Sequence, residues 1–373
     1  MTDTPPARLL SLDVFRGMTI AGMVLVNNPG TWDHVYPALR HSAWNGCTPT
    51  DLVFPFFLFI VGVAITLSLS KRKERGDDMG KLMRKIAFRA AAIFAIGVAL
   101  NGFPLYHMSE LRIPGVLQRI AIVYFFSSLL FLKTNIKTQI SVGAGALLLY
   151  WGLMTLIPVP GVGHASLEPE TNLGAYIDRA LFSGHLWSVT KTWDPEGLLS
   201  TLPAIGTGIA GLLLGHWLRT THDISTKTAW IFVAGTLTTL AGIIWDIWFP
   251  INKALWTGSY VLYTAGMALL FFGTIYWLVD ARRITWWTRP FVVFGLNAIA
   301  LYIIAWITET LCWIIQVSTA PGTSVSLITY VYDNYLLALL SPINASLVWA
   351  VLFVVGHLGI MWVLYAKKIF IKL

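Results

Sequence analysis

The sequence predicts an all-α polytopic membrane protein with about ten spanning helices and one membrane domain over residues 1–373. The first observation is composition: 56% of the 373 residues are hydrophobic and only 12% are charged, whereas a soluble domain carries about a quarter charged residues. The second is a succession of apolar runs of about 20 residues, the length at which a helix crosses the hydrocarbon layer. The third is that Lys and Arg lie in the short loops between these runs. The net charge of +8 is therefore interpreted as a topology signal and not as a nucleic-acid surface.

The first apolar run covers residues 9–28 and contains Asp13 and Arg16. No small-residue cleavage site follows it, so we expect it to remain as the first span rather than to be removed as a signal peptide. The complete series of predicted spans is 12–28, 52–70, 83–102, 113–132, 140–157, 198–218, 229–249, 259–279, 291–317 and 345–365.

Clusters of Lys and Arg set the predicted orientation, because cytoplasmic loops retain positive charge during insertion. The connection between the second and third spans carries Lys71, Arg72, Lys73, Arg75, Lys81, Arg84 and Lys85. If the spans alternate, the same side receives Lys133, Lys137, Arg219, Lys227, Arg282, Arg283, Arg289, Lys367, Lys368 and Lys372. An even number of spans then places both termini in the cytoplasm, and the expected location is the inner (cytoplasmic) membrane.

Two segments lie outside this series. Counting residues 327–340 as a span would move the Lys-rich C-terminus to the outside, and Asp333 and Asn334 lie in the middle of that run. We predict an interfacial or re-entrant helix there, on the outer face. Residues 158–197 are rich in Pro and Gly and poor in Lys and Arg, which predicts one long external loop.

Ionisable groups within spans are costly unless they are paired or face a cavity, so each is a functional candidate. Asp13 and Arg16 lie one helical turn apart near the inner end of the first span, which permits an ion pair. A structural role and a cavity-lining role both remain open for that pair. Other polar residues gather toward the outer face, namely Asn27, Asn28, His41, Asp51, Arg112, Gln118, Arg119, Asp246 and Glu309. One polar cavity that opens outward would account for all of them.

Asp51 has a strong structural interpretation. The run Thr48-Pro49-Thr50-Asp51 offers an N-cap residue, a proline at the first helical position and an acid at the third. This pattern starts a helix, and it favours capping by Asp51 over catalysis.

Arg112 and Arg119 are seven residues apart and would share one face of a helix that opens at Pro114. Their charge suits a phosphate or a carboxylate, and a CoA phosphate is the expected ligand group. Snorkelling to headgroups is the structural alternative for Arg112. For Arg119 it is a salt bridge with Asp246 or Glu309.

His41 lies in the segment between the first two spans and precedes Ser42-Ala43-Trp44-Asn45-Gly46. A neutral imidazole can take a proton from an amine or hydroxyl as that group attacks a carbonyl. Loop histidines are more often solvated side chains, and His34 and His107 compete on the same terms. Chemistry alone leaves the choice open.

At these residues the sequence resembles the transmembrane acyltransferase family of heparan-α-glucosaminide N-acetyltransferase, whose bacterial members are the NagX-type proteins. The resemblance rests on Ser11-Leu12-Asp13-Val14-Phe15-Arg16-Gly17, Val26-Asn27, His41-Ser42-Ala43-Trp44-Asn45-Gly46 and Asp51-Leu52-Val53-Phe54-Pro55-Phe56-Phe57. It continues in Arg112-Ile113-Pro114-Gly115-Val116-Leu117-Gln118-Arg119, Trp256-Thr257-Gly258-Ser259-Tyr260 and Gly295-Leu296-Asn297-Ala298. These blocks extend over nearly the whole chain.

The resemblance implies transfer of an acetyl group from cytoplasmic acetyl-CoA to a glucosamine-like amine on the other side of the membrane, without a metal. It makes His41 the catalytic histidine and Asn27 its supporting amide. Trp44, Asn45, Trp256 and Tyr260 join the polar residues above as expected substrate contacts. The expected partners are the bilayer, acyl-CoA and an amino sugar or glycan, a homodimer is left open, and no nucleic acid is expected.

The sequence departs from the lysosomal enzyme in lacking its lumenal N-terminal extension and in a longer linker between Asn27 and His41. The acceptor therefore remains open between a large glycan, a free amino sugar and a cell-envelope sugar. Two mechanisms remain open: direct attack with His41 as base, and transient acetylation of His41.

The main alternative function is that of an amino-sugar permease, for which matching broken helices in the two halves of the chain would be diagnostic. A membrane scaffold is the third possible function, but it would leave the energetic cost of the polar cluster near the outer face unexplained.

Overall fold

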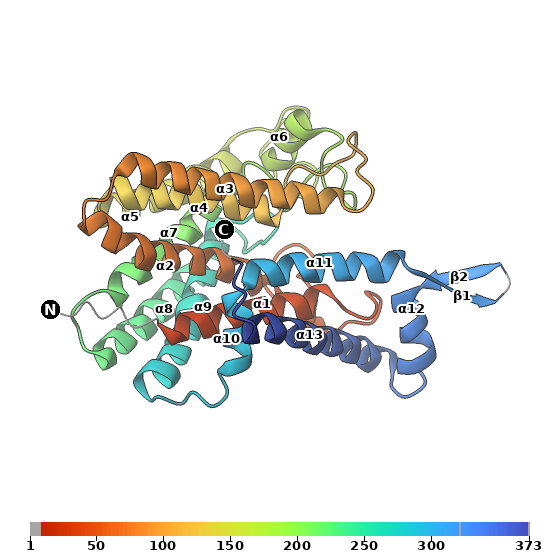
Figure 1. The fold of residues 1–373 in the computed structure, drawn as a ribbon. Coiled ribbons are helices and arrows are strands. Elements are labelled where there is room, and N and C mark those ends of the chain that lie inside the picture. The colour runs from red at the N-terminus through yellow and green to blue at the C-terminus, as the bar shows by residue number, and fades with distance from the viewer. Residues whose placement is uncertain (1–8, 321, 372–373) are drawn as a thin grey trace. The chain divides into compact units, whose positions relative to one another are not determined.

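A computed structural model describes residues 9–320 and 322–371, and it is built largely of α-helices (Figure 1). The longer helices are α1 (Leu10–Asn27), α2 (Val53–Glu74), α3 (Met79–Gly102), α4 (Val116–Lys133), α5 (Ile136–Leu156), α7 (Thr201–Leu218), α8 (Ile224–Asp246), α9 (Gly258–Tyr276), α11 (Ala298–Ile314) and α13 (Pro342–Ala366). The shorter elements are η1 (Pro37–Leu39), η2 (Pro49–Leu52), α6 (Leu173–Phe182), η3 (Trp277–Ala281), α10 (Arg289–Leu296), β1 (Gln316–Ala320), β2 (Thr323–Ser326), α12 (Leu327–Val331) and η4 (Tyr332–Leu336).

The chain divides into two compact units. Unit 1 contains the described residues of 1–41, 48–53 and 271–372, and unit 2 contains 42–47 and 54–270. Each unit is described by itself below. His41 thus belongs to unit 1 and the residue after it, Ser42, to unit 2.

Within the described residues, 8 helices are long and apolar enough to cross a membrane, and the bent pair α10 and α11 makes up to 9. Each predicted span is helical over most of its length, but the count of about ten is not confirmed. The difference is the predicted span 83–102, which lies in α3. Lys81, Arg84, Lys85 and Arg89 lie in the first half of α3, so this helix is less apolar than the others.

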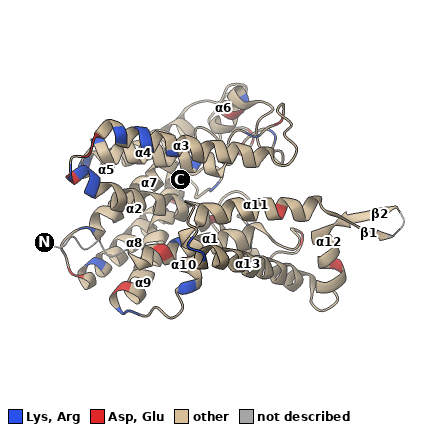
Figure 2. Cartoon of the chain, in the orientation of Figure 1, with Lys and Arg blue, Asp and Glu red and all other residues tan. Residues whose placement is uncertain are grey.

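In unit 2 the basic connections lie together at one end of the helices. The ammonium group of Lys73, at the end of α2, donates to the carbonyl oxygens of Phe131 and Thr134, where α4 ends. Arg219, after α7, pairs with Glu74 at 2.7 Å. Figure 2 shows Lys and Arg gathered at the α2–α3 connection. These contacts agree with the predicted alternation of basic and non-basic loops in this unit.

Close helix packing in unit 2 depends on small residues. A Cβ at Gly62 would lie 2.0 Å from the carbonyl oxygen of Gly208, and one at Gly211 would lie 2.0 Å from that of Phe59. The backbones of α2 and α7 therefore touch, as is common where membrane helices associate through small residues. Phe54 and Leu58 of α2 belong to a hydrophobic cluster of the same unit. Trp256 and Tyr260 are also members of this cluster, and both are fully buried.

In unit 1, α1 packs against α10, α11 and α13. A Cβ at Gly17 would lie 1.7 Å from the carbonyl oxygen of Phe291, so α1 and α10 are also in backbone contact. The predicted ion pair within α1 is confirmed, with Arg16 Nη1 3.4 Å from Asp13 Oδ1. The same nitrogen donates to the carbonyl oxygen of Gly295 at 3.3 Å.

The prediction of one continuous helix over 291–317 is wrong. Helices α10 and α11 meet at an angle of 84°. Asn297 lies at the break, where its amide donates to the carbonyl oxygen of Ile369 and accepts from the N–H of Ile371, both at 2.9 Å. The side chain thus stabilises the C-terminal segment at the point where the helix ends.

The segment 327–340 forms two short helical elements, α12 and η4, and is not among the candidate spans. This agrees with its predicted exclusion from the series. An antiparallel hairpin, β1 and β2, precedes it after α11 (Figure 1) and was not predicted. Helix α6, within the predicted loop 158–197, was also missed.

Candidate active site

His41 lies beside a buried carboxylate. Its Nδ1 is 2.6 Å from Oδ1 of Asp51, whose side chain has no solvent exposure, whereas the side chain of His41 is 43% exposed. Oδ2 of Asp51 accepts hydrogen bonds from the backbone N–H and the hydroxyl of Thr48, each at 3.0 Å. The predicted capping role of Asp51 is confirmed, and the same carboxylate also holds a histidine.

Side-chain hydrogen bonds fix the chain on both sides of this pair. The hydroxyl of Thr48 donates to the carbonyl oxygen of Arg40 at 2.6 Å, and that of Thr50 donates to the carbonyl oxygen of Ala38 at 3.3 Å. These bonds connect the turn η1, which precedes His41, with the turn η2, which contains Asp51. Proline at the first position of each turn fixes one backbone dihedral in advance.

The geometry selects one arrangement of protons on the imidazole. A carboxylate facing Nδ1 favours a proton on that nitrogen, so the lone pair resides on Nε2. A histidine oriented in this way by a buried acid is the arrangement used for general-base and nucleophilic catalysis. The pair can therefore take a proton from a reacting group.

Three other predicted residues of unit 1 line one cleft. Asn27, Asn28 and Glu309 all contribute to the wall of this small cleft. The amide nitrogen of Asn28 donates to the carbonyl oxygen of Val24 at 2.7 Å. The cleft brings the end of α1 together with α11, as the predicted polar cavity requires for these three residues.

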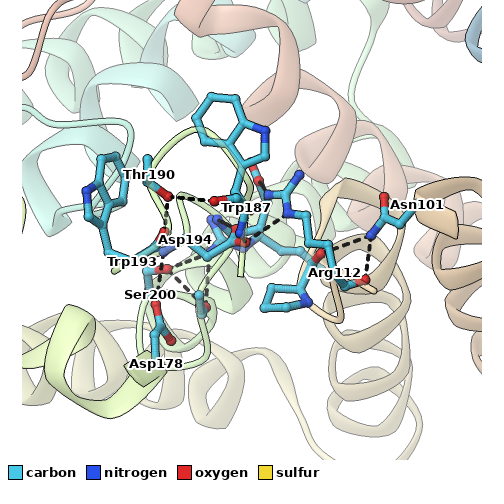
Figure 3. Close-up of polar contacts among 12 residues, drawn as sticks. Asn101, Arg112, Asp178, Trp187, Thr190, Trp193, Asp194 and Ser200 are labelled. Atoms are coloured by element: carbon cyan, nitrogen blue, oxygen red, sulfur yellow. Dashed lines mark hydrogen bonds and ion pairs between the residues drawn. The ribbon is translucent and has the colours of Figure 1, made fainter. Parts of the chain in front are cut away.

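In unit 2, Arg112 forms a bidentate ion pair with Asp194 (Figure 3). Its Nε and Nη2 lie 2.8 and 2.6 Å from the two carboxylate oxygens, and Nη2 is also 2.6 Å from Glu196. The expectation that Arg112 and Arg119 share one helix face is therefore wrong, because Arg112 precedes α4, which begins at Val116.

Burial and charge oppose each other in this cluster. Burial disfavours the charged guanidinium of Arg112, but the hydrogen bonds and charges of Asp194 and Glu196 outweigh it and raise its pKa above the ordinary value. Burial likewise opposes ionisation of Glu196, and the neighbouring Arg112 lowers its pKa on balance. Burial raises the pKa of Asp178 to about 6, although the N–H groups of Leu198 and Asp194 act in the other direction.

Arg119 lies on α4 and is buried, with 1% exposure. Its Nη2 donates to the hydroxyl of Ser200 and to the carbonyl oxygen of Gly197, and its guanidinium carbon lies 4.9 Å from the ring centre of Trp256. Among the described residues, neither Nε nor Nη1 of Arg119 has a hydrogen-bond partner. The salt bridge with Asp246, one of the structural alternatives for Arg119, is not formed among the described residues of unit 2.

Trp256, whose ring faces Arg119, belongs to the run Trp256-Thr257-Gly258-Ser259-Tyr260 on which the family resemblance partly rests. It is fully buried, has φ +53°, and donates from its indole N–H to the hydroxyl of Thr207 at 3.2 Å. The left-handed backbone is unusual for an aromatic residue, and such strain is concentrated at functional sites. Tyr260 packs edge-on against the Trp256 ring at 5.3 Å between centres.

The remaining predicted residues of unit 2 lie in several different segments of that unit. Trp44 donates to the carbonyl oxygen of Leu167 at 3.1 Å, and Asn45 accepts from the amide of Asn252 at the same distance. Asp246 ends α8 and accepts the backbone N–H of Ile251. Gln118 is buried, with 3% exposure, and its amide nitrogen has no hydrogen-bond partner within the described structure.

Sequence reasoning missed the acidic side of unit 2. Asp194, Glu196 and Asp178 all lie in the predicted external loop, whose prediction rested on its Pro and Gly content and its lack of Lys and Arg. The acids of Trp193-Asp194-Pro195-Glu196-Gly197 were the available signal, because a loop with two carboxylates near a span can supply counter-charges to an intramembrane arginine. Among residues 9–320 and 322–371, no cluster of three His, Cys, Asp or Glu could hold a metal ion.

The fold and these residues define a class: a helical membrane protein with a histidine–carboxylate pair and a buried arginine. Residues 8–232 match the family model described as heparan-alpha-glucosaminide N-acetyltransferase, catalytic. The chain belongs to this family. It is similar to human heparan-alpha-glucosaminide N-acetyltransferase, with 33% identity over 353 residues, covering 80% of this chain and 52% of the relative. The mouse protein of that name is 31% identical, with 79% and 53% coverage, so the chain spans about half the length of these relatives.

Proposed function

We propose that this chain is a transmembrane, acyl-CoA-dependent N-acetyltransferase of the inner membrane. Acetyl-CoA from the cytoplasm is the donor, and the amine of an amino sugar or glycan on the outer side is the acceptor. The observation that carries the proposal is the contact between His41 and the buried Asp51 in a member of this family. The most informative single test is release of free thiol by purified protein given acetyl-CoA and a panel of amino sugars.

The proposed reaction is direct aminolysis of the thioester. The amine nitrogen bonds to the acetyl carbon as the C–S bond breaks, and Nε2 of His41 accepts the proton that the amine loses. The imidazolium, held by Asp51, then returns the proton to the departing CoA sulfur. A thioester needs little activation, so positioning and proton removal supply most of the rate. Asn27 supports the reacting carbonyl or the amine as a neutral hydrogen-bonding group.

Transient acetylation of His41 is the other mechanism. It would release CoA before an acceptor is present, whereas direct attack requires the acceptor. We favour direct attack, because His41 is 43% exposed and an acyl-imidazole reached by water would be hydrolysed.

Arg119 is proposed to bind an anionic or carbonyl group of acetyl-CoA. A buried guanidinium with unused N–H donors is costly, and a ligand acceptor would offset that cost. Arg119→Gln should weaken acetyl-CoA binding by about tenfold or more, as expected for a charge-assisted hydrogen bond. Calorimetry on monodisperse protein measures this. Arg119→Lys is the matched variant, which retains the charge but not the planar fork. Unchanged affinity in Arg119→Gln would leave only the structural contacts with Ser200 and Trp256.

The proposed topology places both termini and the 71–85 loop in the cytoplasm and the 158–197 loop outside. Single cysteines at Arg75, Glu168 and Lys367, in a background without Cys47 and Cys312, should be labelled by a membrane-impermeant thiol reagent only at Glu168 in intact cells. All three should react after permeabilisation. External labelling at Lys367 would mean an odd number of spans and would overturn the assignment.

The break between α10 and α11 is the observation that favours a permease. Transporters of several folds use paired broken helices at matching positions of two halves. Within the described residues only this one bent pair occurs, and it has no counterpart among the candidate spans. Acyl transfer therefore remains the proposed function.

A further inference from the structure

The connection between α9 and α10 in unit 1 carries three arginines and two adjacent tryptophans (Figure 1). The candidate span Gly258–Ala281 ends directly before it, and α10 begins at Arg289. The connection reads Arg282-Arg283-Ile284-Thr285-Trp286-Trp287-Thr288. A segment that starts where a span ends lies beside the lipid headgroups, so we consider this connection as a surface for lipid.

A hydrogen-bonded turn holds the two tryptophans in different surroundings. The N–H of Thr288 donates to the carbonyl oxygen of Thr285 at 3.1 Å, and the hydroxyl of Thr288 donates to the same oxygen at 2.7 Å. Trp286 and Trp287 are the two central residues of this turn. The ring of Trp287 packs edge-on against Phe291 at 5.9 Å between centres, whereas Trp286 is 86% exposed. An exposed indole at the end of a span is typical of the headgroup layer, because its ring is apolar and its N–H is polar.

The three arginines keep their N–H donors available for a ligand. The guanidinium carbon of Arg282 lies 5.4 Å from the ring centre of Trp277, and that of Arg289 lies 5.2 Å from the ring centre of Trp362. A cation is held over a ring by its charge, so these contacts need none of its N–H donors. Arg282, Arg283 and Arg289 are all exposed, and within the described chain none of their guanidinium groups donates a hydrogen bond or forms an ion pair.

Arg283 also has an unusual backbone. Its φ of +60° lies in the left-handed region, which favours glycine and is costly for a larger residue. Its charge acts on Asp280, whose Oδ2 accepts the backbone N–H of Ser11 at 3.2 Å. With +3 from the arginines and −1 from Asp280, residues 280–289 have a net charge of +2. The connection therefore suits an anion.

We propose that residues 282–289 bind the phosphate group of an anionic phospholipid, with the indole of Trp286 in the headgroup layer beside it. Guanidinium groups bind phosphate oxygens through paired, charge-assisted N–H donors. A zwitterionic lipid also carries a phosphate, but its headgroup cation opposes the arginines, so charge complementarity selects an anionic lipid. Each basic residue near an anionic membrane surface strengthens binding by about fivefold. The proposed topology places this lipid in the cytoplasmic leaflet.

Lipid quenching of a dye on the full chain in nanodiscs tests the proposal. A polarity-sensitive thiol dye is attached at Thr285→Cys, in a background without Cys47 and Cys312, which retains Trp286 and the arginines. Brominated phosphatidylglycerol and brominated phosphatidylcholine, each diluted into unbrominated phosphatidylcholine, are compared as quenchers. Half-maximal quenching by the anionic lipid should need a mole fraction at least about tenfold lower. A nanodisc exposes both leaflets, and no acetyl transfer is measured, so the result is independent of the proposed topology and reaction.

Arg283→Gln should raise that mole fraction by about fivefold, because it removes one of the three charges. Arg283→Gly removes the same charge and suits φ +60°, so it should show the same shift even if Arg283→Gln fails to fold. Lys85→Gln is the matched control, because it removes an exposed charge from α3 in unit 2, and it should leave quenching unchanged.

Trp286→Ala should shift the dye emission toward its value in water, because the turn loses the indole that holds it in the headgroup layer. Trp248→Ala removes a 63% exposed indole after another candidate span and should leave the emission unchanged. Equal quenching by the two brominated lipids would overturn recognition of the anionic headgroup. Emission typical of water, with quenching by neither lipid, would overturn the membrane contact. Relief of quenching by added glycerol phosphate would mean that the arginines bind a soluble phosphate and would overturn the lipid assignment.

Discussion

His41→Ala is expected to lower acceptor-dependent release of CoA thiol by about 10²- to 10⁴-fold, the usual worth of a positioned general base. Acetyl-CoA should still bind, because the substitution removes a proton acceptor and no charge that the donor requires. Thiol release under saturating substrates measures the first quantity and calorimetry the second. Turnover near wild type in His41→Ala would sink the catalytic assignment and the main reason to prefer an enzyme over a permease.

Asp51→Asn tests how the histidine is held. The amide can still accept the Thr48 N–H through its oxygen, so the cap survives, but its NH₂ group then faces Nδ1 of His41. This favours the ring tautomer with its proton on Nε2, which cannot act as the base. We expect a loss of turnover approaching that of His41→Ala. Asn27→Ala should lose less, since an amide orients or polarises but does not accept a proton at neutral pH.

The other loop histidines are matched controls. His34→Ala and His107→Ala remove the same side chain at other positions of the chain, and both should retain turnover. A stoichiometric burst of thiol without acceptor would establish an acyl-histidine intermediate and exclude direct attack.

Arg112→Gln is expected to destabilise unit 2 by about 3–5 kcal/mol, because removing one partner from a buried ion pair leaves uncompensated charge. Here two carboxylates, Asp194 and Glu196, would lose the shared guanidinium that lies 2.6 Å from each. The side chain of Arg112 is only 16% exposed, so solvent screens the loss weakly. The midpoint of thermal or denaturant unfolding in detergent measures the change.

The ion pair between Arg219 and Glu74 is the matched comparison, because its side chains are 33% and 60% exposed. Arg219→Gln should cost no more than about 1 kcal/mol. Adding Glu196→Gln to Arg112→Gln should recover part of the loss by removing one of two adjacent buried charges. If Arg112→Gln unfolds like Arg219→Gln but binds acetyl-CoA more weakly, Arg112 is a ligand contact after all.

Much of the fold follows from local pattern. Apolar runs of spanning length predicted the helices, because a backbone in hydrocarbon must satisfy its own hydrogen bonds. The Thr48-to-Asp51 run predicted its cap, and a three-residue spacing predicted the pair of Asp13 and Arg16, since both depend on neighbours one turn apart. The break at Asn297 escaped prediction, because the apolar pattern continues through it and the bonds that stabilise it come from residues 369 and 371.

The candidate site divides in the same way. The sequence by itself determined that the chain is a membrane protein of this family. It also identified His41, Asn27 and Arg119 as candidates, because they are polar residues in or beside the apolar spans and lie in the motifs of the resemblance. Only the tertiary structure decided that Asp51 faces His41, that Glu309 shares a cleft with Asn27, and that Arg112 is already neutralised by a loop more than 80 residues away. Composition and spacing report what a residue can do within a helical turn or a hydrophobic run. Packing between distant segments decides which charged side chains form ion pairs. Burial then determines whether a charged group stabilises the protein through its partner or is left without one and can bind a ligand.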